Sequence, residues 1–252
     1  MIQISAVIIT YNEEQNIARC IDSLKNVVDE IVVVDSYSTD LTTDIAKDLD
    51  AKVISYQFNG YGEQKNFAQN QASHNWILSV DADEVISPEL EQSLLEIKQD
   101  PTHDAYKLDI LTNYCGKWIK HCGWYPQPKI RLWDRTKGAM SIDKVHEEWH
   151  LYDKHATVGH LKGDLLHYSY ATISDHIRKI EQYSEIKARI DIEKGKKVSI
   201  IKLWFAPKLE FFVDFILRKG FLDGYYGYLI CRNSAFYSYV KYAKIRQYSR
   251  QK

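Results

Sequence analysis

The sequence predicts an α/β fold in which a mostly parallel sheet has helices on both faces. Two observations carry this prediction. Short β-rich runs alternate with helical patterns over the first third of the 252 residues, and those runs are almost continuously apolar. Continuous apolar runs are typical of parallel strands that are covered on both faces, whereas strands with one solvated face alternate apolar and polar residues. With 45% hydrophobic residues, the chain is long enough to bury such a core.

The first elements in chain order form a βαβαβαβ pattern. Ile17, Cys20, Ile21 and Leu24 follow helical spacing, and so do the apolar positions from Leu41 to Leu49. The expected strands around these helices are Ile4–Thr10, Glu30–Asp35, Lys52–Tyr56 and Trp76–Val80. Ligands of such sheets bind beyond the carboxyl ends of the strands, so the polar residues that follow each strand are the first candidates for a site.

The middle of the chain predicts a mixed extension of this sheet. Ser87 is a good N-cap before Pro88, which indicates a helix from residue 88 to about 98. Strand-like runs follow at Tyr106–Thr112, Lys129–Trp133 and Leu165–Ser169, between loops rich in Gly, Pro, His and Trp. An amphipathic helix is expected from Ile173 to about Glu193.

The C-terminal part is basic, aromatic and amphipathic. From Lys194 onward there are 13 Lys/Arg against 3 Asp/Glu, a balance of +10, so the preceding part has a balance of −11. Along Leu209–Leu217 and its surroundings, Glu210, Asp214 and Arg218 form one narrow polar stripe on an otherwise apolar helix. Such a segment is typical of a helix in a membrane interface, although packing against the body or a second subunit predicts the same pattern.

Composition narrows the function classes. A net charge of −1 does not favour binding to nucleic acid, and four widely spaced cysteines without a CxxC pair favour free thiols. The start of the chain lacks the features of a secretory signal, so we expect a cytoplasmic protein. No uncharged apolar run approaches the ~18 residues of a spanning helix.

Carboxylates after the fourth predicted strand indicate a metal site. Asp81 and Asp83 are two residues apart in a turn, where both can face one Mg²⁺ or Mn²⁺ that bridges phosphate oxygens. Thr10 and Tyr11 end the first strand, where the Tyr11 ring could stack on a nucleobase or simply pack. Asp35 and Asp40 bracket a Ser/Thr-rich turn that could bind a base or ribose, cap the next helix, or do both.

Four blocks of residues resemble the inverting glycosyltransferases of family 2, which have the GT-A fold. The blocks are Thr10-Tyr11-Asn12-Glu13-Glu14, Val33-Val34-Asp35-Ser36-Tyr37-Ser38-Thr39-Asp40, Gln64-Lys65-Asn66-Phe67-Ala68 and Asp81-Ala82-Asp83-Glu84. The resemblance implies a UDP-sugar donor, bound by the first block including Glu13, with Tyr11 near the base and Asp35 toward the uracil. It implies that Lys65 lies near the diphosphate, Asp83 on the metal, and Asp81 near the ribose or the metal.

Later blocks look like those of bacterial enzymes that add glucose to the inner core of lipopolysaccharide or lipooligosaccharide. They are Ile130-Arg131-Leu132-Trp133, Val145-His146-Glu147-Glu148 and Gly220-Phe221-Leu222-Asp223-Gly224 with Tyr242-Ala243-Lys244. The Glu-Asp base motif of many family members is absent here, and Val145-His146-Glu147 stands in its place. We therefore expect Glu147 as the general base, His146 at the metal or diphosphate, and Arg131 at a phosphate or sugar, or else in a salt bridge to Asp134 or a neighbouring strand.

These expectations combine into one leading hypothesis. Residues 1–195 form a GT-A domain, with a nucleotide-binding part up to about residue 100 and an acceptor part at about 101–195, and residues 196–252 form a helical extension. The enzyme moves a hexose, glucose first, from a UDP-sugar to a glycolipid or oligosaccharide acceptor, bound to the cytoplasmic face of the inner membrane through the extension. A polyprenyl phosphate acceptor and a non-catalytic nucleotide-sugar-binding or scaffold protein are the alternatives. An oligomer is possible.

Overall fold

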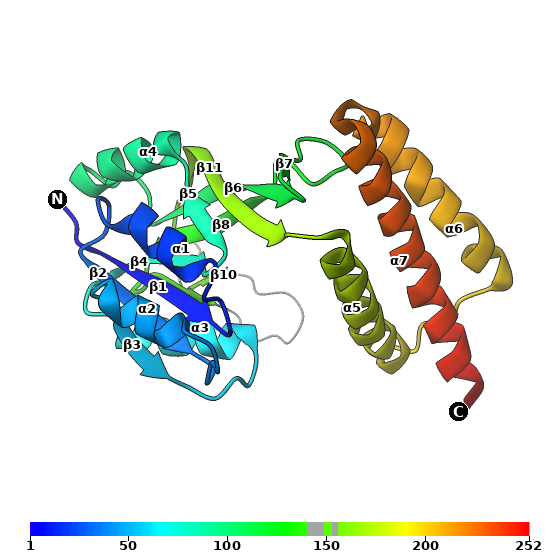
Figure 1. Ribbon diagram of the computed structural model, residues 1–252, viewed down its shortest axis with the longest axis horizontal. Coiled ribbons are helices and arrows are strands. Elements are labelled where there is room, and N and C mark those ends of the chain that lie inside the picture. Colours follow the sequence, from blue (N-terminus) through cyan, green and yellow to red (C-terminus); the bar gives the residue numbers. More distant parts are fainter. Residues whose placement is uncertain (141–148, 153–155, 252) are drawn as a thin grey trace. The chain divides into compact units, whose positions relative to one another are not determined.

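The protein is described by a computed structural model that covers residues 1–140, 149–152 and 156–251 (Figure 1). Its residues group into two compact units, Met1–Ile110 with Gln127–His167, and Leu111–Pro126 with Tyr168–Lys252. This grouping differs from the expected boundary between residues 195 and 196, because the helix over Ile173–Glu193 packs against the C-terminal helix. The expected division into donor, acceptor and extension parts concerns function, and it stays a prediction.

The first unit begins with the predicted βαβαβαβ order. Strands β1 to β4 are parallel and lie in the order β3-β2-β1-β4. Their bounds are Ile4–Thr10, Glu30–Asp35, Lys52–Ser55 and Trp76–Asp81, and the helices between them are α1 (Ile17–Leu24), α2 (Thr42–Asp48) and α3 (Tyr61–Gln71). In the register, Thr10 pairs with Asp35 and Ile9 pairs with Asp81. The loops after β1, β2 and β4 therefore meet at one edge of the sheet.

Helices cover both faces of this sheet, as the continuous apolar strands predict. Ile4, Ala6 and Ile8 of β1 share a core with α1, α2 and α4 (Pro88–Gln99), whereas Val7 points to the opposite face, toward Ala68 of α3. Successive residues of a strand point to opposite faces, so one strand contributes to both cores. The α/β class is confirmed.

The remaining strands extend the sheet as a mixed one. They are β5 (Glu84–Ile86), β6 (Ala105–Tyr114), β7 (Lys117–Trp118), β8 (Pro128–Asp134) and β11 (Val158–Tyr170), and the main order is β3-β2-β1-β4-β8-β6-β11-β5, with β7 beside β6. Strand β8 is antiparallel to β4, and β11 is antiparallel to β5. A separate pair consists of β9 (Gly138–Met140) and β10 (Trp149–Leu151).

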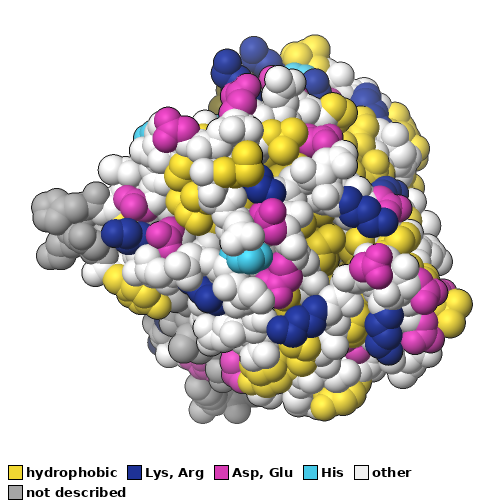
Figure 2. Space-filling view, turned by 90° about the vertical axis from the view of Figure 1, so that its left-hand side faces the viewer, with side chains coloured by type: hydrophobic (Ala, Val, Ile, Leu, Met, Phe, Trp, Pro, Cys, Tyr) yellow, Lys and Arg dark blue, Asp and Glu magenta, His cyan; other side chains and the backbone are white. Residues whose placement is uncertain are grey.

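On the side drawn in Figure 2, acidic and basic side chains are interspersed, in keeping with the net charge of −1.

The second unit is mainly helical, which confirms the expected helical C-terminal part. It contains α5 (Ile173–Glu193), α6 (Ile200–Phe212), a π-helical turn η1 (Val213–Leu217), a 3₁₀ turn η2 (Gly220–Asp223) and α7 (Gly224–Gln251). None of the described helices combines the length and the apolar composition that crossing a membrane requires. All four cysteines are free thiols, and the sulfur atoms of Cys122 and Cys231 lie 3.6 Å apart in the core of this unit.

Candidate functional site

A sharp turn at the end of β4 brings three carboxylates together. Asp81 is the last residue of β4, Asp83 lies in the turn, and Glu84 begins β5. The Glu84 carboxylate accepts a hydrogen bond from the backbone N–H of Asp81 at 2.8 Å, which closes the turn. Glu84 is fully buried, whereas the Asp81 side chain keeps 30% of its surface exposed. Buried carboxylates need cationic partners, and the unit supplies them from other elements.

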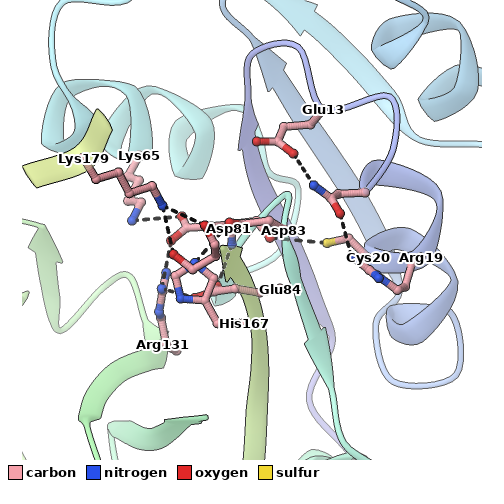
Figure 3. A network of polar contacts seen from close by, with 12 residues as sticks. Glu13, Arg19, Cys20, Lys65, Asp81, Asp83, Glu84, Arg131, His167 and Lys179 are labelled. Carbon is pink, nitrogen blue, oxygen red and sulfur yellow. Dashed lines mark hydrogen bonds and ion pairs between the residues drawn. The ribbon is translucent and has the colours of Figure 1, made fainter. Parts of the chain in front are cut away.

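Two buried cations face these carboxylates (Figure 3). Lys65 of α3 places its Nζ 3.2 Å from Asp81 Oδ1. Arg131 of β8 donates from Nη2 to Asp81 Oδ2 at 2.9 Å and to Glu84 Oε1 at 2.7 Å. Burial alone would raise the pKa of Asp81, but the charges of Arg131 and Lys65 outweigh it and hold that pKa well below its usual value. Burial raises the pKa of Glu84, against the effect of Arg131.

A histidine from a distant part of the chain completes the cluster. Because β11 pairs with β5, His167 lies opposite Glu84 in the sheet. Its Nε2 lies 3.1 Å from Asp83 Oδ2. Burial would lower the pKa of His167, but the hydrogen bond to Asp83 and the nearby carboxylates raise it. Lys65, Arg131 and His167 thus converge on Asp81, Asp83 and Glu84 in Figure 3.

The loops after β1 and β2 form the neighbouring rim and are tied together. The Asp35 carboxylate accepts from the backbone N–H of Ser38 at 2.8 Å, and Ser38 Oγ accepts from the backbone N–H of Asn12 at 2.8 Å. The Glu13 backbone N–H donates to Thr42 Oγ1 at 2.7 Å. These hydrogen bonds tie the two loops together, so that each loop restrains the other.

Of two residues on this rim, Tyr11 offers an exposed surface to a ligand and Thr10 does not. The Tyr11 ring is exposed, so it is open to stacking on a base. The Thr10 hydroxyl oxygen is buried and has no hydrogen-bond partner among the described residues. Asp40 accepts from the backbone N–H of Thr42, the first residue of α2, at 3.0 Å, although the N-cap position itself is Leu41.

The structure therefore brings together Asp81, Asp83, Lys65 and Arg131. Arg131 forms salt bridges with Asp81 and Glu84. This agrees with the predicted alternative of a salt bridge to a neighbouring strand, and the partners are these two residues and not Asp134. His146 and Glu147 lie outside the described residues, and their roles stay predictions. The sequence motifs predict no role for Glu84 or His167. Glu84 could have been found from its place directly after Asp83, whereas the pairing that brings His167 there has no local signal.

Comparison with known proteins decides the family. The family model for Glycosyl transferase family 2 matches residues 5–146, which are more than half of the chain and include Lys65, Asp81 and Arg131 of the site but not His167. The chain belongs to glycosyl transferase family 2. This membership confirms the family predicted from the four sequence blocks, and the Rossmann-like sheet of the transferase, with helices on both faces, is the GT-A architecture expected of that family.

Curated relatives match the transferase over almost its whole length. An uncharacterized glycosyltransferase of Rickettsia typhi is 36% identical over 259 residues, which cover 99% of this chain and 88% of the relative. The lipopolysaccharide core biosynthesis glycosyltransferase LpsC of Rhizobium meliloti is 32% identical over 259 residues, covering 97% of this chain and 92% of LpsC. The similarity thus includes the helical second unit.

Among solved structures, the transferase is similar to glucosyl-3-phosphoglycerate synthase of Mycobacterium tuberculosis, crystallised with Mn²⁺, UDP and glucosyl-3-phosphoglycerate. The two are 27% identical with a TM-score of 0.38. The match spans 46% of this chain and 45% of the synthase, less than half of either.

Proposed function

We propose that the transferase moves a hexose, glucose first among the candidates, from a UDP-sugar to a core glycolipid of the lipopolysaccharide or lipooligosaccharide type, with inversion at the anomeric carbon. The observation that carries the donor part is the cluster of Lys65, Arg131 and His167 around Asp81 and Asp83 at the end of β4. The similarity to LpsC over nearly the whole chain supports the acceptor class.

The site fits a divalent cation by the chemistry of its donors. Asp81 and Asp83 offer hard carboxylate oxygens, and His167 donates from Nε2 to Asp83 and thereby orients that carboxylate. No three acidic, His or Cys side chains form a metal cluster within residues 1–140, 149–152 and 156–251. Mg²⁺ commonly takes only one or two protein carboxylates and fills its shell with water and substrate phosphate, so Asp83 with Asp81 would suffice. Bound there, Mg²⁺ or Mn²⁺ would neutralise the departing diphosphate.

The chain's own residues supply the remaining steps. Lys65 and Arg131 keep two positive charges at the edge of the sheet, where a diphosphate would lie, and their present partner Asp81 holds them in position. Thr10, Tyr11, Glu13 and Asp35 form the rim for the nucleoside. Glu147 would remove the proton from the acceptor hydroxyl as its oxygen attacks the anomeric carbon from the face opposite the diphosphate.

Calorimetric titration tests the donor site. UDP, UDP-glucose, UDP-galactose and GDP-mannose are titrated into the protein with and without Mn²⁺, and into Asp83→Ala. We expect a UDP species to bind only with metal, and Asp83→Ala to abolish that binding. Asp44→Ala is the matched control, since it removes an exposed carboxylate on α2 and should leave binding intact. Absence of nucleotide binding under every condition would overturn the proposal.

Transfer to extracted core glycolipid tests the acceptor and the base. Glu147→Gln should bind the donor like the unmodified protein and lose at least about a hundredfold in transfer rate, as expected for the loss of a general base. Full transfer by Glu147→Gln onto a polyprenyl phosphate, which is already a nucleophile, would instead support that acceptor. If the protein binds the donor but neither transfers nor hydrolyses it, the result would support the alternative of a non-catalytic nucleotide-sugar-binding protein.

A further inference from the structure

Helix α6 has an unusual position for its composition. Its sequence is Ile-Ile-Lys-Leu-Trp-Phe-Ala-Pro-Lys-Leu-Glu-Phe-Phe, yet none of its residues is buried. It packs along α7 within the second unit (Figure 1), and its largest apolar side chains are exposed. Trp204 is 59% exposed and Phe205 is 64% exposed. Six exposed residues make up the outer apolar face of this segment: Ile201, Trp204, Phe205, Leu209, Phe212 and Ile216.

The acidic side chains of the same segment are turned inward. Glu210 accepts a hydrogen bond from Ser238 of α7. Asp214 is 3% exposed and pairs with Arg218 at 2.8 Å. A surface helix of a water-soluble protein normally turns its apolar stripe inward and its charges outward. In this segment the acidic residues point inward and the large apolar side chains are exposed. The outer face therefore suits contact with an apolar neighbour.

The charges around the outer apolar face are basic. Lys202 and Lys208 of α6 and Lys219 after η1 are exposed. The acidic residues from Lys194 to the C-terminus are Glu210, Asp214 and Asp223, and Asp223 is 4% exposed and accepts from the backbone N–H of His121. Acidic residues of α5 compensate part of the balance of +10 in this stretch, since Asp191 pairs with Lys196 and Glu181 pairs with Lys244. The positive charge beside the outer apolar face comes from Lys202, Lys208 and Lys219.

We propose that the outer apolar face of α6 and η1 docks on the surface of a lipid bilayer that carries anionic headgroups. Tryptophan and phenylalanine side chains on such a face enter the boundary between headgroups and acyl chains. The lysines lay their aliphatic stems along the apolar surface and hold their ammonium groups among the phosphates. The pattern suits a lipid surface better than a second copy of this chain, because the same exposed positive charges would face each other in a symmetric pair. The inference stands on this surface alone and does not depend on the donor or the acceptor.

Vesicle flotation with the full chain tests the proposal without nucleotide or acceptor. The vesicles consist of phosphatidylcholine alone, or of phosphatidylcholine with phosphatidylglycerol, each at low and high salt. We expect binding to the anionic vesicles that weakens with salt. Lys202→Glu with Lys208→Glu should lower the partition coefficient by at least about tenfold, since each basic residue near an anionic surface adds to the attraction. Trp204→Ser with Phe205→Ser should lower it by a similar factor through lost apolar insertion.

Matched substitutions in the first unit separate docking from general effects. Lys25→Glu with Lys47→Glu changes the net charge equally, and Phe58→Ser with Leu95→Ser removes exposed apolar side chains; both should bind like the unmodified chain. Trp204→Phe should keep binding but reduce quenching of tryptophan fluorescence by brominated lipid. Absence of binding to anionic vesicles, or equal loss in the control variants, overturns the proposal. So does a concentration-dependent dimer that Trp204→Ser with Phe205→Ser dissociates while vesicle binding is absent.

Discussion

At the scale of single residues, Arg131 joins two carboxylates of the site. It is 5% exposed and contacts Asp81 and Glu84, which come from two sides of one turn. The arginine therefore holds the turn closed and keeps a positive charge beside the position proposed for a diphosphate. A buried ion pair contributes little net stability compared with apolar residues, but losing one member leaves the other charge buried without compensation.

Arg131→Met should destabilise the first unit by roughly 3–5 kcal/mol, because Glu84 is fully buried. Urea unfolding followed by circular dichroism measures the loss. Removing the second charge as well should restore part of it, so the loss in Arg131→Met with Glu84→Gln should be smaller than the sum of the two single losses. Additive losses would contradict the assignment of Glu84 as the charge that Arg131 compensates.

At the scale of elements, the place of His167 depends on how β11 crosses the start of α4. Ser87 and Asp164 exchange hydrogen bonds of 3.0 Å, from Ser87 N–H to the Asp164 carbonyl and from Asp164 N–H to Ser87 Oγ. Gly163 lies directly before this contact with a φ of +88°, and a Cβ there would lie 2.2 Å from the backbone nitrogen of Leu90. The glycine thus permits the close approach that sets β11 against β5.

Gly163→Ala should therefore lower the free energy of unfolding by more than backbone strain alone would. Gly116 has the same φ of +88°, and a Cβ at that position would have no heavy atom within 4 Å, so Gly116→Ala is a control that reports the conformation alone. We expect about 1 kcal/mol of lost unfolding free energy for Gly116→Ala and at least about 2–3 kcal/mol for Gly163→Ala. Chemical denaturation of both variants measures the difference, and equal losses would show that β11 and α4 do not approach so closely.

At the scale of the whole molecule, stability at low pH depends on the helical unit as well as on the site. His176 of α5 is 6% exposed, and its Nδ1 lies 3.0 Å from Asn233 Nδ2 and 3.1 Å from the Tyr114 hydroxyl. Burial, with a contribution from Lys179, lowers the pKa of His176 to about 4. The unfolded chain binds this proton near its ordinary pKa of about 6.5, and the folded chain does not.

The contribution of His176 to stability should therefore be complete above pH ~6.5 and be lost as the pH falls toward about 4, with a slope of at most about 1.4 kcal/mol per pH unit. Urea midpoints across this window measure it as a difference between the unmodified chain and His176→Gln, since the other titrating groups are common to both. A constant difference between the two proteins over the window would contradict the buried, neutral state of His176.

Much of the fold could be predicted because its signals are local. The apolar runs predict β1 and β2 with the observed bounds, Ser87 and Pro88 predict the start of α4, and the helix over Ile173–Glu193 matches its periodicity. The predicted strand at Leu165–Ser169 is too short, because β11 continues over Val158–Tyr170 with many half-buried positions that give no clear alternation.

The sequence by itself determined the α/β class, the family, and the carboxylates at the end of β4, since each depends on residues that are close together in the chain. Only the tertiary structure decided that Arg131, Lys65 and His167 face those carboxylates, and that the acidic residues of α6 and η1 turn inward. The physical reason is that strand pairing and helix packing bring together residues that are up to 84 positions apart in the chain. Such a pairing cannot be predicted from the local spacing of residues around either partner.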